Sequence, residues 1–88
     1  MIVHIGYDVC VESREVVAVL DYKNALASPQ TLAFIEQAQA AARYTPCAYG
    51  TRSLVLLNAP PGTQIIESAL ATATLKARLT GQGLQEEA

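Results

Sequence analysis

The stretch Glu15-Val16-Val17-Ala18-Val19-Leu20-Asp21 is the most strand-like part of the chain. Three valines and a leucine fall within five positions, and β-branched residues favour the pleated strand. Apolar and polar residues do not alternate along it, so both of its faces are expected to contact protein rather than water. We therefore predict a strand with another strand beside it and a helix or a second subunit across one face.

Four further runs have the composition of short strands: residues 1–6, 8–12, 54–57 and 63–67. Because only Ser13-Arg14 separates the second run from the valine-rich stretch, the first 22 residues predict a meander of antiparallel strands. The stiff loop Ala59-Pro60-Pro61-Gly62 connects the last two runs. Residues 22–27 are interpreted as a connector.

Two helices are expected between and after these strands. Ser28 has the character of an N-cap and Pro29 suits the first helical position. The apolar stripe of this first helix consists of Leu32, Ile35, Ala38 and Ala42, and the helix is expected to end before Pro46. Thr72 is expected to cap a short final helix with Leu75 and Leu79 on one face and Gly81 as its stop. The order of elements predicts the α+β class: a small β-rich domain with one central helix and a short C-terminal helix.

Composition favours one small domain that hides apolar surface by self-association. The chain has 88 residues, of which 51% are hydrophobic and only 16% charged, against about 25% charged in an ordinary globular domain. We assign residues 1–80 to the domain and residues 81–88 to a flexible acidic tail. The net charge is −2, which argues against a generic nucleic-acid binder. Outside the tail, acidic and basic residues are equal in number, so an oligomer could still repeat a basic patch.

Catalytic and metal-binding constellations are not found in the sequence. His4 is the only histidine and is expected to be partly buried and hydrogen-bonded. Cys10 and Cys47 lie in apolar stretches without a CxxC pattern, so buried reduced thiols are favoured over zinc ligands, and a disulfide between them stays open. We expect no enzyme activity, no metal and no cofactor. No run is long enough to span a bilayer, and a cytoplasmic protein without a membrane partner is expected.

Several stretches together resemble the RemA/RemB family of extracellular matrix regulatory proteins (DUF370). The resemblance rests on four segments in the same order: Ile2-Val3-His4-Ile5-Gly6, Ser13-Arg14-Glu15-Val16-Val17-Ala18, Gly50-Thr51-Arg52-Ser53-Leu54-Val55 and Thr74-Leu75-Lys76-Ala77-Arg78. It covers roughly residues 1 to 79. The match is closer to the RemB branch, whose members begin Ile-His-Leu-Gly and carry Thr-Leu-Lys-Lys-Arg near the end.

The resemblance implies a bacterial transcriptional regulator of biofilm-matrix genes with a LytTR-like domain, which assembles into rings that bind double-stranded DNA. Arg14 matches an arginine of the early strand, and Arg52 matches a basic turn in which RemA carries several arginines. Lys76 and Arg78 complete the set of expected DNA-phosphate contacts. Because the turn at Arg52 keeps only one positive charge, DNA binding would depend on repetition around the ring.

A second interpretation remains open from the sequence. A homo-oligomeric interaction or scaffold protein of the same fold, without any nucleic-acid role, fits the acidic balance and the small number of arginines. The two interpretations differ in the expected surface. DNA binding favours basic side chains gathered on one face, whereas the scaffold favours basic side chains scattered into ion pairs.

Overall fold

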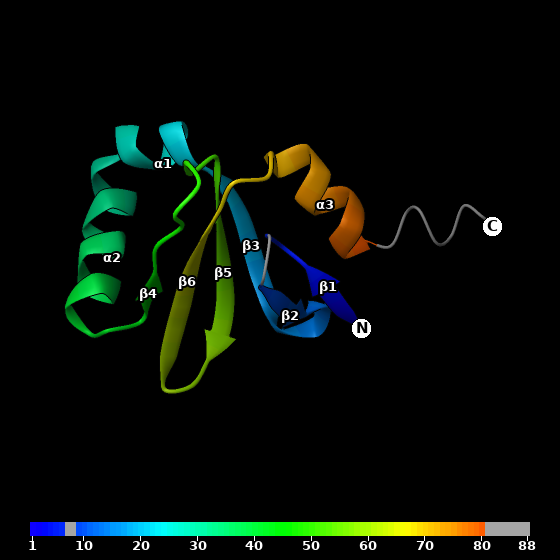
Figure 1. The fold of residues 1–88 in the computed structure, drawn as a ribbon. Helices are drawn as coiled ribbons and strands as arrows, with labels where there is room; N and C mark the ends of the chain where they lie inside the picture. Colours follow the sequence, from blue (N-terminus) through cyan, green and yellow to red (C-terminus); the bar gives the residue numbers. More distant parts are fainter. Residues whose placement is uncertain (7–8, 81–88) are drawn as a thin grey trace.

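The computed structural model describes residues 1–6 and 9–80, which form an α+β domain with two sheets (Figure 1). The α+β class predicted from the sequence is confirmed. The elements in chain order are β1 (Ile2–His4), β2 (Cys10–Glu12), the 3-10 turn η1 (Ser13–Glu15), β3 (Val16–Asp21), α1 (Tyr22–Ala27), α2 (Pro29–Ala40), β4 (Tyr44–Thr45), β5 (Ser53–Ala59), β6 (Gly62–Ser68) and α3 (Thr72–Thr80).

The larger sheet has the strand order β3-β5-β6-β4, and β1 and β2 form a separate two-stranded sheet. β5 is antiparallel to both of its neighbours, whereas β4 runs parallel to β6. β1 and β2 pair as predicted, but β3 does not continue this meander and pairs with β5 instead. The turn η1 redirects the chain between β2 and β3, and β5 offers β3 a longer apolar partner than the three-residue β2.

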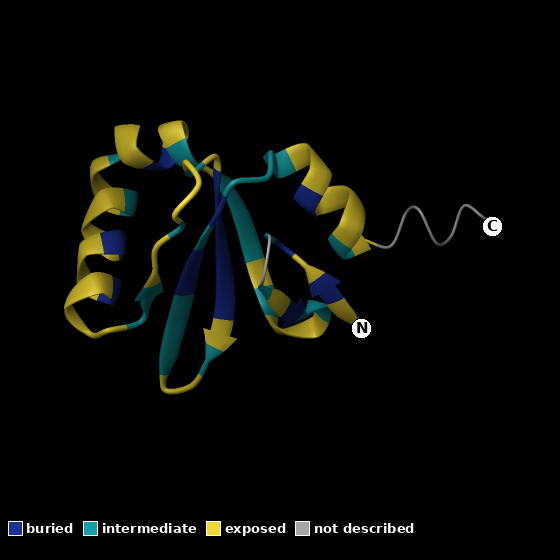
Figure 2. Ribbon diagram, viewed as in Figure 1, coloured by how far each residue is buried: buried dark blue, intermediate teal, exposed yellow. Residues whose placement is uncertain are grey.

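Both faces of β5, a central strand of the larger sheet, are covered by protein (Figure 2). Val55 and Leu57 pack in one core with β1, β2 and α3. Leu54 and Leu56 pack in a second core with α1, α2 and β6. The larger sheet is therefore the middle of three layers, and a period of two along β5 divides its side chains between them.

β3 is an edge strand with an irregular register. Val16 pairs with Leu57 and Ala18 pairs with Leu56, so Val17 is the extra residue of a β-bulge. The bulge allows Val16 to join the first core and Ala18 to join the second, and it leaves Val17 64% exposed. The prediction that both faces of this strand contact protein is confirmed, since Val16 and Val19 pack against the first core and Ala18 and Leu20 against the second. Apolar composition alone does not distinguish an edge strand from a central one.

Residues 22–27 form helix α1, where the sequence predicted only a connector. The carboxylate of Asp21 caps this helix by accepting a hydrogen bond from the backbone N–H of Asn24 (3.1 Å). The start of α2 is as predicted, because the Ser28 hydroxyl accepts from the N–H of Thr31 (3.3 Å) and Pro29 is the first helical residue.

The predicted apolar stripe of α2 is buried only in part. Ile35 and Ala38 lie in the second core, whereas Leu32 and Ala42 are exposed. The helix ends at Ala40, two residues before Ala42, which adopts a left-handed conformation with a φ of 59°. The predicted stripe therefore extends beyond the residues that are helical.

Three further predictions concern polar residues and the C-terminus. His4 and Cys10 are exposed and Cys47 is partly exposed, so the predicted burial of both thiols and of the histidine is wrong. Both thiols are free in the structure. The predicted helix stop at Gly81 and the acidic tail of residues 81–88 lie outside the described residues. Within the described part of the chain, no helix is long and apolar enough to cross a bilayer.

We predict that the centre of β5 carries much of the stability and the bulge of β3 carries little. Leu54→Ala is expected to lower the free energy of unfolding by about 2–5 kcal/mol, because a cavity forms in a fully enclosed site. Val17→Ala is expected to change it by less than ~0.5 kcal/mol, because this side chain faces solvent. Urea denaturation of both variants measures the difference, and equal losses would contradict the three-layer packing.

Candidate nucleic-acid interface

The backbone of Arg52, one of the predicted phosphate contacts, is hydrogen-bonded on both sides. Its N–H donates to the carbonyl of Ser68 (2.8 Å), and its own carbonyl accepts from the N–H of Tyr22 (3.1 Å). These two hydrogen bonds join the start of β5 to the end of β6 and to α1 (Figure 1). The Arg52 side chain is exposed. A rigid backbone therefore presents an exposed guanidinium to solvent at this end of the sheet.

Glu67 on β6 holds the loop that precedes Arg52. Its Oε1 accepts from the backbone N–H of Cys47 (2.9 Å) and from the hydroxyl of Thr51 (2.6 Å), while Oε2 accepts from the hydroxyl of Tyr44. We call this arrangement the Glu67 clamp. The three donors come from β4 and from the chain between β4 and β5, so one carboxylate fixes the path of the segment leading into Arg52.

The clamp shifts the pKa values of both ionisable partners. Burial raises the pKa of Glu67, but the hydrogen bonds from Thr51, Tyr44 and Cys47 favour its charged form more strongly and keep the pKa below its usual value. Burial raises the pKa of Tyr44, and the hydrogen bond to Glu67 raises it further. Glu67 is therefore an anion at neutral pH, while Tyr44 stays protonated as its donor.

Lys76 and Arg78 lie on opposite sides of α3. Positions two apart on a helix do not share a face. The buried side of the helix carries Leu75, which packs in the first core. Lys76 lines a groove beside β3, whereas Arg78 reaches β1, where Nη1 donates to the carbonyl of His4 (3.1 Å). The two cations grouped by the sequence pattern are thus divided between two regions of the surface.

Arg14 lies at the far end of β3 from Arg52. Its side chain is 85% exposed, and its Nε is 3.6 Å from Oε2 of Glu12, which also binds the N-terminal ammonium. Hydrogen bonding to that ammonium lowers the pKa of Glu12. The strand Val16–Asp21 separates the two arginines by roughly 17–20 Å, taking about 3.3 Å per residue. The predicted set therefore does not form a single patch within one chain.

Lys23 is a further cation that the sequence interpretation missed. It is exposed in the first turn of α1, one residue after Tyr22, whose N–H binds the carbonyl of Arg52. Arg52, Lys23 and Lys76 thus all belong to segments that meet where β3 ends and α1 begins (Figure 1). Asp21 is a typical N-cap residue, and this signal in the sequence could have placed Lys23 on a helix.

The remaining arginine, Arg43, is partly buried and donates from Nε to the carbonyl of Thr63 (3.2 Å).

Two other observations limit the chemistry of this surface. Within residues 1–6 and 9–80, no group of three or more His, Cys, Asp and Glu side chains is placed to hold a metal ion. The ion pairs of the same described residues both involve Glu12, so Arg52, Lys76 and Arg78 are not paired with carboxylates there. Exposed guanidinium and ammonium groups of this kind can bind anions such as phosphate.

Comparison with known families identifies the class of this domain. The family described as RemA-like, extracellular matrix regulatory protein A-like, matches residues 2–79, nearly the whole described domain. The chain belongs to this RemA-like family. A search among curated proteins gives no match.

We predict that the Glu67 clamp makes stability depend on pH. Because the folded pKa of Glu67 is lowered, its contribution is present above the unfolded pKa and is lost as pH falls through the folded pKa. Glu67→Gln is expected to cost roughly 1–2 kcal/mol at neutral pH, because an uncharged amide accepts weaker hydrogen bonds. Denaturation should be measured from neutral to acidic pH. The difference in free energy of unfolding between wild type and Glu67→Gln should become smaller as the pH falls.

Glu36→Gln on α2 is the matched control, since this carboxylate is exposed and lies outside the clamp. It is expected to leave the pH profile of unfolding unchanged. A gap for Glu67→Gln that stays constant at every pH would mean that the charge of Glu67 does not hold the loop.

Proposed function

We propose that this chain is a homo-oligomeric, ring-forming regulator of extracellular-matrix genes that binds double-stranded DNA through its phosphates. Membership of the RemA-like family supports a role in extracellular matrix regulation. The observation that carries the DNA-binding part is Arg52, an exposed guanidinium on a backbone fixed from both sides. On this proposal the protein belongs to the RemB branch, acts in the cytoplasm, and performs no catalysis.

The charge balance requires that binding be multivalent. One chain has a net charge of −2, and its cations lie at separate places around the domain. Phosphate contacts add to affinity through the release of counterions, and weak contacts held on one assembly add together. Arg52 and Lys76, with Lys23 beside them, would form the repeated contact, and Arg14 and Arg78 would contribute where neighbouring subunits bring them together.

Exposed apolar side chains support self-association. Leu26, Leu32 and Phe34 are large apolar residues exposed on α1 and α2, and Val17 is exposed on β3. A small domain with this much uncovered apolar surface gains free energy by burying it against another subunit. The pattern fits an assembled state of the protein.

The alternative is a homo-oligomeric scaffold of the same fold without nucleic-acid binding. The separation of Arg14 from Arg52 along β3 favours this alternative, because the four predicted contacts do not converge within one chain. The absence of ion pairs at Arg52, Lys76 and Arg78 in the described residues favours DNA binding, because their charges stay available.

We predict salt-dependent DNA binding that depends on the charge at position 52. Fluorescence anisotropy of a long labelled duplex should show tight binding at low salt that weakens steeply as salt rises. Arg52→Gln is expected to reduce the slope of log affinity against log salt by about 0.9 for each phosphate that the variant no longer neutralises. Arg52→Lys is the control, and it should keep most of the slope because the charge remains.

Both variants should unfold at nearly the same denaturant concentration as wild type, because the side chain is exposed. If the assembled wild-type protein does not bind DNA even at low salt, the DNA-binding proposal is wrong and the scaffold function is the one that stands.

We also predict that the protein is oligomeric in solution through its exposed apolar surface. Light scattering after size-exclusion chromatography should give a mass several times that of the 9.4 kDa chain. Phe34→Glu is expected to shift the distribution towards smaller species, since it places a charge in the apolar surface of α2. Glu36→Gln on the same helix should leave the mass unchanged. A monomeric wild-type protein at micromolar concentration would contradict the proposal.

A further inference from the structure

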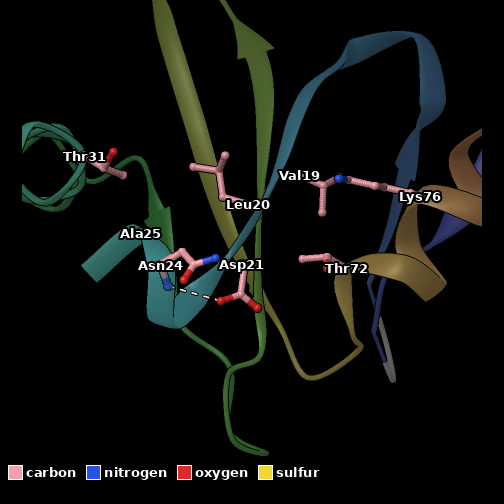
Figure 3. Close-up of a pocket in the computed structure, with 8 residues that line it drawn as sticks. All are labelled: Val19, Leu20, Asp21, Asn24, Ala25, Thr31, Thr72 and Lys76. Carbon is pink, nitrogen blue, oxygen red and sulfur yellow. Dashed lines mark hydrogen bonds between the residues drawn. The ribbon is translucent and has the colours of Figure 1, made fainter. Parts of the chain in front are cut away.

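A groove of about 440 Å³ runs along the free edge of β3 (Figure 3). Val19 and Leu20 lie on the strand itself, at the base of the groove. Residues of α1 and α2, including Ala25 and Thr31, line one side. Thr72 and Lys76 of α3 line the other side. The edge of the sheet is therefore the floor of a channel between two helical walls.

The backbone of β3 can form further hydrogen bonds in this groove. In an edge strand, alternate residues direct their N–H and C=O groups away from the neighbouring strand. β3 pairs with β5 on one side, and among the described residues no other segment forms a ladder with its outer side. A strand placed in the groove would extend the sheet by β-strand addition.

The walls favour a single extended segment over a second folded copy of the domain. Strands pair at about 4.8 Å, so the backbone of the incoming strand must lie between α1–α2 and α3. A second copy using its own β3 edge would bring its own pair of walls against these walls. A peptide segment carries no such walls and can enter along its length.

The charge of the groove indicates the chemistry of its occupant. The ammonium of Lys76 forms no ion pair within the described part of the chain, and Lys23 and Arg52 lie on segments adjoining the same end of the strand. Asp21, the one carboxylate that lines the groove, keeps its negative charge but belongs to the α1 side, where it caps the helix by accepting the N–H of Asn24. An incoming acidic side chain would therefore meet an available cation.

We propose that this groove binds an extended acidic segment of a partner protein, which adds to β3 as a fifth strand of the larger sheet. Side chains of an extended segment alternate between its two faces. An Asp or Glu of the segment faces Lys76 and Thr72, and the next residue, small or β-branched, faces Ala25 and Thr31. The peptide site goes beyond the proposed DNA-binding function and does not depend on it, although Lys76 belongs to both, so an occupied groove would withdraw Lys76 from phosphate.

The test begins with selection of peptides from a random dodecapeptide phage library on the immobilised full-length protein. The peptide with the highest enrichment is then synthesised and titrated by fluorescence anisotropy. We expect enriched sequences with an Asp or Glu among β-branched residues. Lys76→Glu is expected to weaken binding roughly tenfold or more, because attraction becomes repulsion. Exchanging the acidic residue of the peptide for Lys should restore binding to this variant.

Lys23→Glu is the matched control, since Lys23 is exposed on α1 but does not line the groove. It should change affinity much less than Lys76→Glu. N-methylation of the peptide amides that face β3 should abolish binding, whereas N-methylation of the amides on the opposite edge should be tolerated. This pair of peptides separates strand addition from a general attraction between charges.

Three outcomes would overturn the proposal. One is enrichment of no sequence, or of sequences without acidic residues. Another is binding that is insensitive to Lys76→Glu or to N-methylation. The third is a different occupant of the groove. If hydrogen exchange shows that the β3 amides are protected in the assembled protein and lose this protection on dilution, a second copy of the chain occupies the edge. If duplex DNA shifts the NMR signals of the β3 amides, a nucleic acid occupies it.

Discussion

The burial of β5 on both of its faces is the constraint on which the rest of the domain depends. Val55 and Leu57 hold the layer of β1, β2 and α3, and Leu54 and Leu56 hold the layer of α1 and α2. Each fully buried side chain of this size contributes about 1.5–3 kcal/mol. A domain of 88 residues has few such positions, so one strand that serves two cores stabilises three layers at once.

The same central strand fixes the geometry of the proposed DNA contact. β5 begins directly after Arg52, and the backbone of Arg52 is bound by β6 on one side and by α1 on the other. The Glu67 clamp then holds the preceding loop through charged hydrogen bonds, which are stronger than neutral ones. The fold thus fixes the position of the Arg52 backbone, while the charged Arg52 side chain stays exposed and can contact a phosphate.

The edge of the sheet at β3 has a different physical character. β3 is an apolar strand that lies in a groove between helices, and its outer backbone edge has no neighbouring strand among the described residues. Natural proteins usually cover or block an edge strand of this kind. The bulge at Val17 increases local twist and interrupts a flat edge, which limits uncontrolled pairing. Lys76 adds selectivity, because a like charge in an incoming strand would be repelled. The edge is therefore suited to a specific partner rather than to any exposed strand.

Local signals in the sequence determined the α+β class, the start of α2 at Ser28-Pro29 and the strand at Leu54–Leu57, since capping chemistry and apolar runs act over a few residues. Arg52 was singled out by the resemblance to the RemA/RemB family and not by a local signal. Only the tertiary structure decided that β3 pairs with β5 at the edge of the larger sheet instead of continuing the β1–β2 hairpin. It also decided that Glu67 accepts hydrogen bonds from three donors on β4 and the chain that follows β4. Pairing and burial depend on residues far apart in the chain, which local composition does not encode.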